Sequence, residues 1–301
     1  LSSSEECLGR GASGQFVLGG GQAAKHAAVS APLARPFWPG GIASWLTGTP
    51  LIVHEQNAIA GMTNRWLANI ATRVLCGFPN AFADRPGTQH VGNPVRKEIL
   101  NLPLPTQRYG EHRGACRVLV VGGSQGAQVF NRVLPQAIAQ LPPEARPEVW
   151  HQAGRTQHEQ TQQDYDRAGI PARATAFIDD MAAAYAWADV VICRAGAMTL
   201  AELCAAGVAA ILVPYPHATD DHQTANATAD KHTANAPSLP HRTPALFIPE
   251  IAFSVAHIGE LLRGFAQARS GLLAMAERAR SLAMPDATEQ VVRHCLEAVH
   301  A

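Results

Sequence analysis

The residues with the clearest potential for chemistry lie between positions 189 and 223, around a turn at Gly196. After this glycine, Ala197–Ala206 are good helix formers, and the start of such a helix offers free N–H groups and a positive dipole end that suit a phosphate. Glu202 would lie one to two turns into the helix, within reach of a neutral hydroxyl group. The pattern indicates a site for a phosphorylated ligand, although a packed strand–helix–strand unit without a ligand explains it equally well.

Apolar runs on both sides would hold this helix in place. Residues 189–193 and 209–214 are short and aliphatic, which is typical of buried parallel strands, and Gly207 occupies a C-terminal cap position. A second glycine-rich turn, Gly122-Gly123-Ser124-Gln125-Gly126-Ala127, follows the strand-like residues 117–121 and would also let backbone approach a phosphate. It matches neither GxGxxG nor the P-loop pattern, so it predicts neither of those folds.

Composition excludes several classes of protein. Only 16% of the 301 residues are charged and the net charge is zero, which argues against a protein held to nucleic acid by bulk charge. No apolar run approaches the roughly 20 residues that span a bilayer, and the N-terminus lacks a basic-then-apolar signal pattern. The six cysteines have no CxxC spacing, so we interpret them as reduced residues of a cytosolic protein, not as disulfides or zinc ligands.

Two patterns could suggest a metal site. Asp164-Tyr165-Asp166 matches the DxD pattern of metal-dependent transferases, but it lies in a polar, helix-like run with no strand before it, so a solvated surface is favoured. His217 and His222 lie near Asp220 and Asp221 with irregular spacing, which favours a polar substrate loop. We therefore predict no metal and no cofactor.

The order of the segments predicts an α/β protein of two domains. Residues 50–54 and 73–76 are typical of strands of the first, and residues 117–121, 147–152 and 174–177 of strands of the second. From the N-terminus, we expect an irregular or disordered segment 1–38, a partial N-terminal domain 39–98, an interdomain linker 99–114 containing Pro103 and Pro105, a C-terminal domain 115–285 and a C-terminal helix 286–301.

A polar triplet, Glu55-Gln56-Asn57, would follow the strand at 50–54, at the end where open α/β sheets bind ligands. His54 closes that strand and could act as a base, but a structural hydrogen bond is the favoured interpretation.

Five stretches, in one order, carry a resemblance: HEQNAIAG (54–61), GNPVR (92–96), VGGSQGA (121–127), FIDDMAAAYAWADVVICRAGAMTLAEL (177–203) and DDHQTANA (220–227). Together they resemble the MurG family, the peptidoglycan N-acetylglucosaminyltransferases that make lipid II. The similarity covers roughly residues 39–227 and 249–299. It implies the GT-B architecture, with two Rossmann-like domains facing across a cleft and a C-terminal helix returning to the first.

The resemblance also implies which residues meet the donor, UDP-N-acetylglucosamine (UDP-GlcNAc), mainly in the second domain. By matching position, Ser124 would meet the diphosphate, and the Ile178 backbone would contact the uracil. Glu202 would bind the ribose, while Gln223 and Asn57 would contact the sugar. Arg194 would orient a loop. Arg96 would face the nucleotide, and so would the start of the helix, which consists of Ala197, Met198, Thr199, Leu200 and Ala201.

The implied reaction is an inverting transfer to lipid I, forming lipid II on the cytoplasmic face of the bacterial inner membrane. The partners would be UDP-GlcNAc, lipid I and the anionic membrane surface, with no nucleic acid. The leaving diphosphate gains negative charge, which backbone N–H groups and a helix dipole stabilise without a metal.

The sequence departs from the family at two places. It contains no GGTGGH loop, and of the family's second glycine-rich segment only Pro39-Gly40-Gly41 is present. We therefore leave the catalytic residue unknown, do not promote His26 to that role, and expect an incomplete N-terminal domain with impaired turnover. The hypothesis is that residues 1–37 are truncated or misframed, and the same frame-slip hypothesis applies to residues 228–243.

Two alternatives remain beside the transferase: a UDP-sugar-binding remnant without turnover, and a GT-B enzyme with another acceptor. Trp45 and Leu46 are either a remnant of the family's membrane-facing patch or, equally, part of a core.

Overall fold

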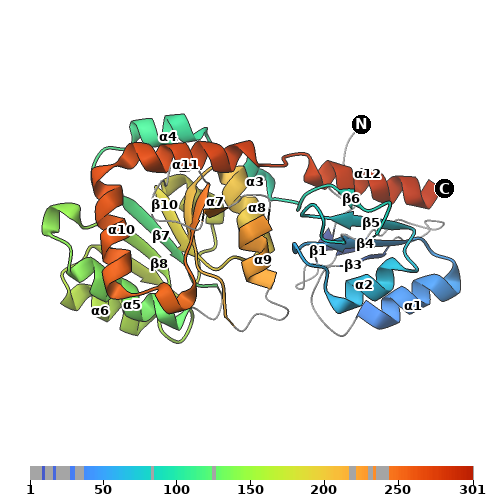
Figure 1. Cartoon of the computed structure of the whole chain (residues 1–301), viewed down its shortest axis with the longest axis horizontal. Coiled ribbons are helices and arrows are strands. Elements are labelled where there is room, and N and C mark those ends of the chain that lie inside the picture. The colour runs from blue at the N-terminus through green and yellow to red at the C-terminus, as the bar shows by residue number, and fades with distance from the viewer. Residues whose placement is uncertain are drawn as a thin grey trace. The chain divides into compact units, whose positions relative to one another are not determined.

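The structure, a computed structural model, describes residues 9–10, 16–17, 28–30, 37–82, 85–123, 127–216, 222–229, 233–234 and 244–300. The chain divides into two compact units, each described here by itself (Figure 1). The first unit consists of Leu1–Pro94 and Met284–Ala301, and the second of Val95–Ala283. The chain therefore passes from one unit to the other twice.

The first unit is built on a six-stranded sheet in the order β1-β2-β3-β4-β5-β6, antiparallel from β1 to β3 and parallel from β3 to β6. Its elements are β1 (Gly9–Arg10), β2 (Phe16–Val17), β3 (Ala28–Ser30), α1 (Phe37–Thr47), β4 (Leu51–Glu55), α2 (Met62–Ala68), β5 (Arg73–Cys76), β6 (Gln89–His90) and α12 (Ala287–His300).

The side chains of β4 alternate between two apolar layers, because successive residues of a strand point to opposite faces. Leu51 and Val53 pack with Leu67 of α2, whereas Ile52 packs with Cys295 of α12. Figure 1 shows α1 and α2 over one face of this sheet and α12 over the other. The C-terminal helix is thus part of the first unit.

The second unit is built on a parallel seven-stranded sheet in the order β12-β13-β11-β10-β7-β8-β9. Its strands are β7 (Arg117–Val121), β8 (Glu148–Gln152), β9 (Ala172–Thr175), β10 (Val190–Cys193), β11 (Ala209–Leu212), β12 (Thr233–Ala234) and β13 (Ala245–Phe247). Its helices are α3 (Lys97–Leu100), α4 (Pro105–Glu111), α5 (Gln128–Ala139), α6 (His158–Arg167), α7 (Met181–Trp187), α8 (Ala197–Ala206), α9 (His222–Thr228), α10 (Val255–Gln267) and α11 (Arg269–Ser281), with 3₁₀ turns η1 (Pro143–Ala145) and η5 (Glu250–Ala252).

The centre of this sheet is apolar on both faces. Val120 and Ile192 join a core with Phe130 of α5 and Leu262 of α10. Leu119, which points to the opposite face, is also fully buried. Strands so covered read as unbroken aliphatic runs, which is why β7, β10 and β11 were recognisable in the sequence.

A buried ionic cluster surrounds Asp189, which is only 3% exposed and lies at the end of the sheet where its parallel strands begin. Its carboxylate accepts hydrogen bonds from Arg269 Nη2 at 2.7 Å and from the backbone N–H of Arg117 at 2.9 Å, and His112 Nδ1 lies 3.0 Å away. The Tyr109 hydroxyl donates to the Asp189 carbonyl at 2.5 Å. One carboxylate therefore ties α11 and the segment before β7 to the start of β10.

Residues 99–114, expected as an interdomain linker, are instead part of the second unit, because α4 packs against α11. Pro105 sits at the start of α4, where its fixed φ favours a helix. Arg108 of α4 then donates to the carbonyls of Tyr185 at 3.0 Å and Ala206 at 2.6 Å, which anchors α7 and α8. The division between units falls earlier, between Pro94 and Val95.

Other predicted elements lie close to their expected positions. The strand expected at 174–177 is shifted to Ala172–Thr175, while α8 has the expected bounds. Within the expected irregular segment 1–38, the structure describes β1, β2, β3 and the start of α1, and the remainder lies outside the described residues. Within 228–243 it describes Thr228, Ala229 and β12, which pairs with β13.

Candidate functional site

The start of α8 is the centre of the candidate site. Gly196 is its N-cap, with φ −69° and ψ 140° and no side-chain hydrogen bond to the first turn. The helix closes at Gly207, which adopts the left-handed conformation (φ 61°) that glycine allows at little cost. Ala197 and Leu200 are buried, whereas Met198, Thr199 and Ala201 are partly exposed. The first-turn N–H groups therefore have no side-chain cap, as a phosphate site requires.

Glu202 is the charged residue of this helix, and both of its carboxylate oxygens have partners. Arg96 Nη2 lies 3.0 Å from Oε1, and the Tyr185 hydroxyl donates to Oε2 at 3.1 Å. Arg96 comes from the N-cap of α3 and Tyr185 from α7. All three residues belong to the second unit, so the arrangement is internal to one compact body.

Ile178, expected to contact uracil through its backbone, follows β9 and is 3% exposed. The neighbouring Phe177 is 54% exposed. Asp180, two residues after Ile178, caps α7 by accepting a hydrogen bond from the Ala183 N–H at 2.8 Å. The buried Ile178 side chain and this cap fix the backbone that would present polar groups to a base.

Arg194 organises the loops at the carboxyl end of β10. It donates to the Val213 carbonyl at 3.2 Å and pairs with Glu250 at 2.5 Å, and its guanidinium lies 5.3 Å from the centre of the Tyr215 ring. The Tyr215 N–H in turn donates to Gln223 Oε1 at 2.9 Å. Arg194 and Gln223 therefore both hold residues 213–215, which directly follow β11.

In the first unit, Asn57 is held by a carboxylate that the sequence analysis did not single out. Glu55 is fully buried and accepts hydrogen bonds from Asn57 N at 2.8 Å, Asn57 Nδ2 at 3.1 Å, Gly61 N at 3.0 Å and Asn64 Nδ2 at 2.9 Å. A buried charge needs such compensation, and here it fixes the loop after β4. The only signal in the sequence is an acidic residue at a strand end.

His54 lies at the end of β4 with a structural role. Its Nε2 is 2.9 Å from the Gly92 carbonyl, and burial lowers the pKa of the imidazole. Because a carbonyl can only accept, Nε2 carries the proton of a neutral ring. The geometry supports the structural hydrogen bond expected from the sequence over a role as base.

Several other expected features lie apart from α8 or beyond the described residues. Ser124, His217, Asp220 and Asp221 are outside the residues that the structure describes. Within those it does describe, no group of three or more His, Cys, Asp or Glu side chains is arranged to hold a metal ion. The DxD pattern lies on α6, where Asp164 accepts from Gln160 at 2.9 Å and pairs with Arg167 at 3.1 Å.

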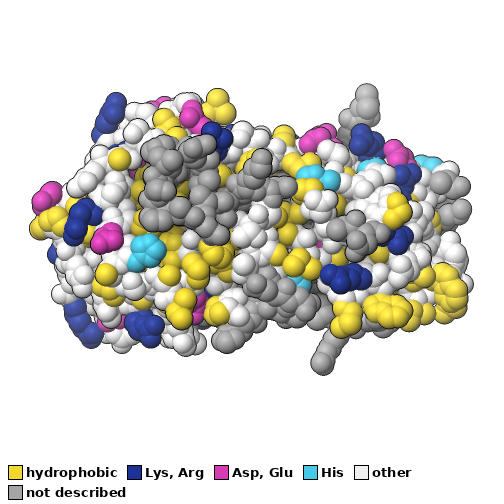
Figure 2. Space-filling model, viewed as in Figure 1, with side chains coloured by type: hydrophobic (Ala, Val, Ile, Leu, Met, Phe, Trp, Pro, Cys, Tyr) yellow, Lys and Arg dark blue, Asp and Glu magenta, His cyan; other side chains and the backbone are white. Residues whose placement is uncertain are grey.

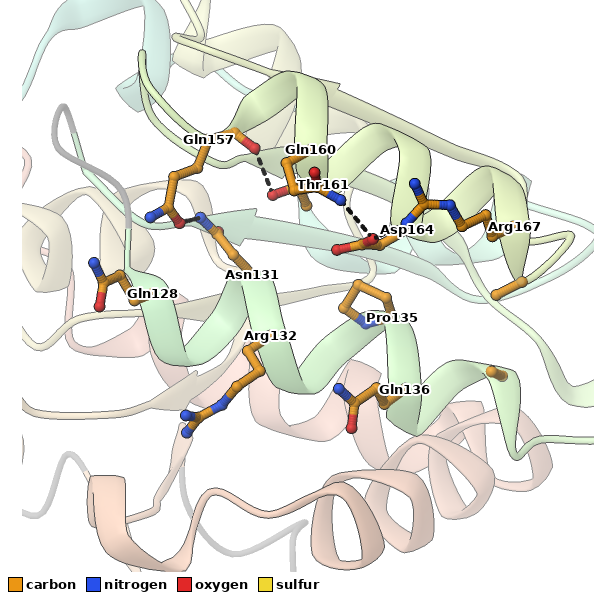
Figure 3. Close-up of a pocket in the computed structure, with 12 residues that line it drawn as sticks. Gln128, Asn131, Arg132, Pro135, Gln136, Gln157, Gln160, Thr161, Asp164 and Arg167 are labelled. Atoms are coloured by element: carbon orange, nitrogen blue, oxygen red, sulfur yellow. Dashed lines mark hydrogen bonds and ion pairs between the residues drawn. The ribbon is translucent and has the colours of Figure 1, made fainter.

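A groove of about 760 Å³ runs between α5 and α6, lined mainly by polar side chains including Gln128, Asn131, Gln157 and Asp164 (Figure 3). Figure 3 shows Asn131 and Gln157 bonded to one another across it, 2.7 Å apart. None of the residues expected to meet the donor lines this groove, so its size does not make it the site.

Known proteins are similar to this chain over most of its length. The model of the glycosyltransferase family 28 C-terminal domain matches residues 117–290, and that of the family 28 N-terminal domain matches residues 22–76. The chain is 52% identical over 262 residues to the UDP-N-acetylglucosamine–N-acetylmuramyl-(pentapeptide) pyrophosphoryl-undecaprenol N-acetylglucosamine transferase of Marinobacter nauticus, covering 87% of this chain and 70% of the relative. It is 50% identical to the enzyme of that name from Dechloromonas aromatica, covering 86% of this chain and 70% of the relative.

The crystal structure of Acinetobacter baumannii MurG superposes with a TM-score of 0.75 at 36% identity, covering 90% of this chain and 72% of that one. The chain belongs to the MurG family. Its two α/β units, one with a mixed sheet and one with a parallel sheet, are those of a GT-B glycosyltransferase. The match to the family 28 N-terminal domain begins at residue 22, ahead of Pro39, where the expected resemblance to MurG begins.

Proposed function

We propose that this chain transfers N-acetylglucosamine from UDP-GlcNAc to lipid I, with inversion at the anomeric carbon. The observation that carries the proposal is the Glu202 carboxylate, set between Arg96 and Tyr185 beside the uncapped start of α8. The names of the relatives specify an N-acetylglucosamine transferase with this donor and acceptor.

The role proposed for each residue follows from the chemistry of its side chain or backbone. The start of α8, with Ala197, Met198, Thr199, Leu200 and Ala201, stabilises the diphosphate through its N–H groups and dipole, together with Ser124 and Arg96. Glu202 accepts hydrogen bonds from the ribose hydroxyls, and the Ile178 backbone pairs with uracil. Gln223 is proposed for the sugar, and Arg194 as the residue that holds Val213 and Pro214 after β11.

The bond changes balance without a cofactor. An acceptor hydroxyl oxygen attacks the anomeric carbon, the bond from that carbon to the diphosphate breaks, and UDP leaves with the electron pair. The hydroxyl proton passes to a base that we leave unassigned. Because the negative charge grows on the diphosphate, groups that meet it there lower the barrier most.

The direct test is transfer from UDP-GlcNAc labelled in the sugar to lipid I by the full chain, with the Marinobacter relative assayed in parallel. We expect labelled lipid whose glycosidic linkage is inverted relative to the donor. Release of UDP without labelled lipid, or transfer only to a different acceptor, would contradict the proposal.

We further propose that the protein works as a peripheral protein on the cytoplasmic face of the inner membrane. An apolar patch, defined by Ile42, Trp45, Leu46, Met62, Trp66 and Ile70, lies on and just after α1 and α2, and each side chain is at least 39% exposed. Figure 2 shows hydrophobic side chains gathered over these two helices. Trp45 at 64% and Leu46 at 71% are therefore not core residues.

Positive charge beside the apolar patch favours binding on the surface of an anionic bilayer. Arg65 and Arg85 line a hollow beside α2, where they supply positive charge next to the apolar patch. No helix within the described ranges has the length and apolar character needed to cross a membrane.

Replacing both tryptophans, Trp45→Ser with Trp66→Ser, is expected to weaken binding to phosphatidylglycerol vesicles about 30-fold. Each indole loses roughly 1 kcal/mol of burial in the interface, since only part of it enters the bilayer. Vesicle co-sedimentation measures this change. The matched control is Leu104→Ser with Ile251→Ser, two exposed apolar residues of the second unit, which should bind like wild type. Equal losses in both variants would rule out the apolar patch as the docking surface.

A further inference from the structure

Tyr185 is a buried residue beside Glu202 that is not among the residues proposed to contact the donor. Its side chain is 1% exposed, and its hydroxyl reaches Glu202 Oε2 at 3.1 Å. A carboxylate only accepts, so the phenol must be the donor. Burial raises the pKa of Tyr185 well above its usual value, and the Glu202 charge raises it further, so the donating proton is always present.

The backbone that carries this phenol is fixed from both ends. Asp180 caps the start of α7 through the Ala183 N–H, and Arg108 of α4 donates to the Tyr185 carbonyl at 3.0 Å. Arg108 also donates to the carbonyls of Ala206 and Gly207, each at 2.6 Å, at the end of the helix that carries Glu202. One arginine therefore sets the spacing between the helix of the phenol and the helix of the carboxylate.

The two partners of Glu202 act on different oxygens. Arg96 holds Oε1 and Tyr185 holds Oε2, so together they remove the rotational freedom of a side chain that is otherwise among the most flexible. Each carboxylate oxygen has a second lone pair, so both can still accept from a ligand. A carboxylate fixed in this way presents two acceptors in the spacing of a vicinal diol.

We propose that Tyr185 is a positioning residue that orients the Glu202 carboxylate toward the two ribose hydroxyls of the uridine nucleotide, and thereby sets selectivity for a ribonucleotide. This inference rests on the proposed function, in which Glu202 binds the ribose. Tyr185 itself does not touch the ligand, because its hydroxyl is buried against the carboxylate.

The test compares two ligands on one preparation of the full chain. Isothermal titration calorimetry gives the Kd of UDP and of 2′,3′-dideoxyuridine 5′-diphosphate, which lacks both hydroxyls. Wild type should prefer UDP. Tyr185→Phe should weaken UDP binding about 3- to 10-fold, the range of one lost orienting hydrogen bond, and leave the dideoxy ligand unchanged. The readout is the ratio of the affinity for UDP to the affinity for the dideoxy ligand. Partial unfolding of the variant lowers both affinities alike, so it does not affect this ratio.

Two further variants complete the design. Tyr109→Phe removes a buried hydroxyl at the opposite edge of the same sheet and should lower stability without changing the ratio. Glu202→Gln should reduce the ratio if Glu202 binds the ribose, and an unchanged ratio there would overturn that part of the proposed function. A reduced ratio in Glu202→Gln with a wild-type ratio in Tyr185→Phe would overturn the role of Tyr185 alone.

Discussion

Replacing Asp189 by alanine is expected to lower the free energy of unfolding of the second unit by about 3 kcal/mol, which for a body of this size corresponds to a fall in Tm of roughly 6–12 °C. The carboxylate is 3% exposed and compensates the Arg269 guanidinium and the Arg117 N–H. Removing it takes the acceptor from a backbone N–H and from a partly buried guanidinium, and that desolvation loss exceeds the value of an ordinary hydrogen bond.

Scanning calorimetry is the appropriate measurement, because two compact units can unfold in separate transitions that a single optical probe would average. The matched control is Asp164→Ala, which removes an aspartate paired with an arginine on the surface of the same unit. Exposed pairs contribute little, so this variant should melt within about 2 °C of wild type. Equal melting of Asp189→Ala and wild type would show that the cluster does not hold the sheet edge.

Replacing Glu202 by alanine is expected to weaken UDP-GlcNAc binding about 30- to 150-fold. Two hydrogen bonds from ribose hydroxyls to a charged acceptor are lost, together worth about 2–3 kcal/mol when the cost of leaving the hydroxyls partly unsatisfied is included. The variant also frees Arg96, which then keeps its attraction for the diphosphate and limits the loss. Calorimetric titration of the full chain measures the Kd directly.

Glu148→Ala is the matched control for this prediction. Glu148 is also a glutamate of the second unit that faces an arginine, with Arg117 Nε 3.6 Å away, but it begins β8, at the end of that strand away from the start of α8. Its variant should bind UDP-GlcNAc like wild type. A Glu202→Ala variant that stays folded and binds within 3-fold of wild type would remove Glu202 from the donor site.

The centre of the second unit was predictable from the sequence because β7, β10 and β11 are aliphatic runs and a glycine follows α8. The bounds of α8 and the left-handed cap at Gly207 follow from that pattern. The segment at 99–114 was misinterpreted because Pro103 and Pro105 resemble a linker, whereas a proline at the first turn also begins a helix. Only packing decides between these two meanings.

The partners of the site residues were harder to foresee. Arg96 and Glu202 are separated by 106 positions, and no local pattern joins them until the fold brings α3 against α8. In the sequence, Tyr185 is one aromatic residue in an alanine-rich stretch, and Glu55 is one acid in a polar triplet. Their roles depend on burial and on donors from other segments, which are properties of the folded chain.

The measurement that most directly tests a donor site at the start of α8 is amide hydrogen exchange on the full chain with and without saturating UDP-GlcNAc. We expect slower exchange in peptides that contain Ile178 and residues 196–202, with no change around Tyr109, where the strands begin. Protection confined to the groove between α5 and α6, or absent from residues 196–202 while UDP-GlcNAc is bound, would contradict it.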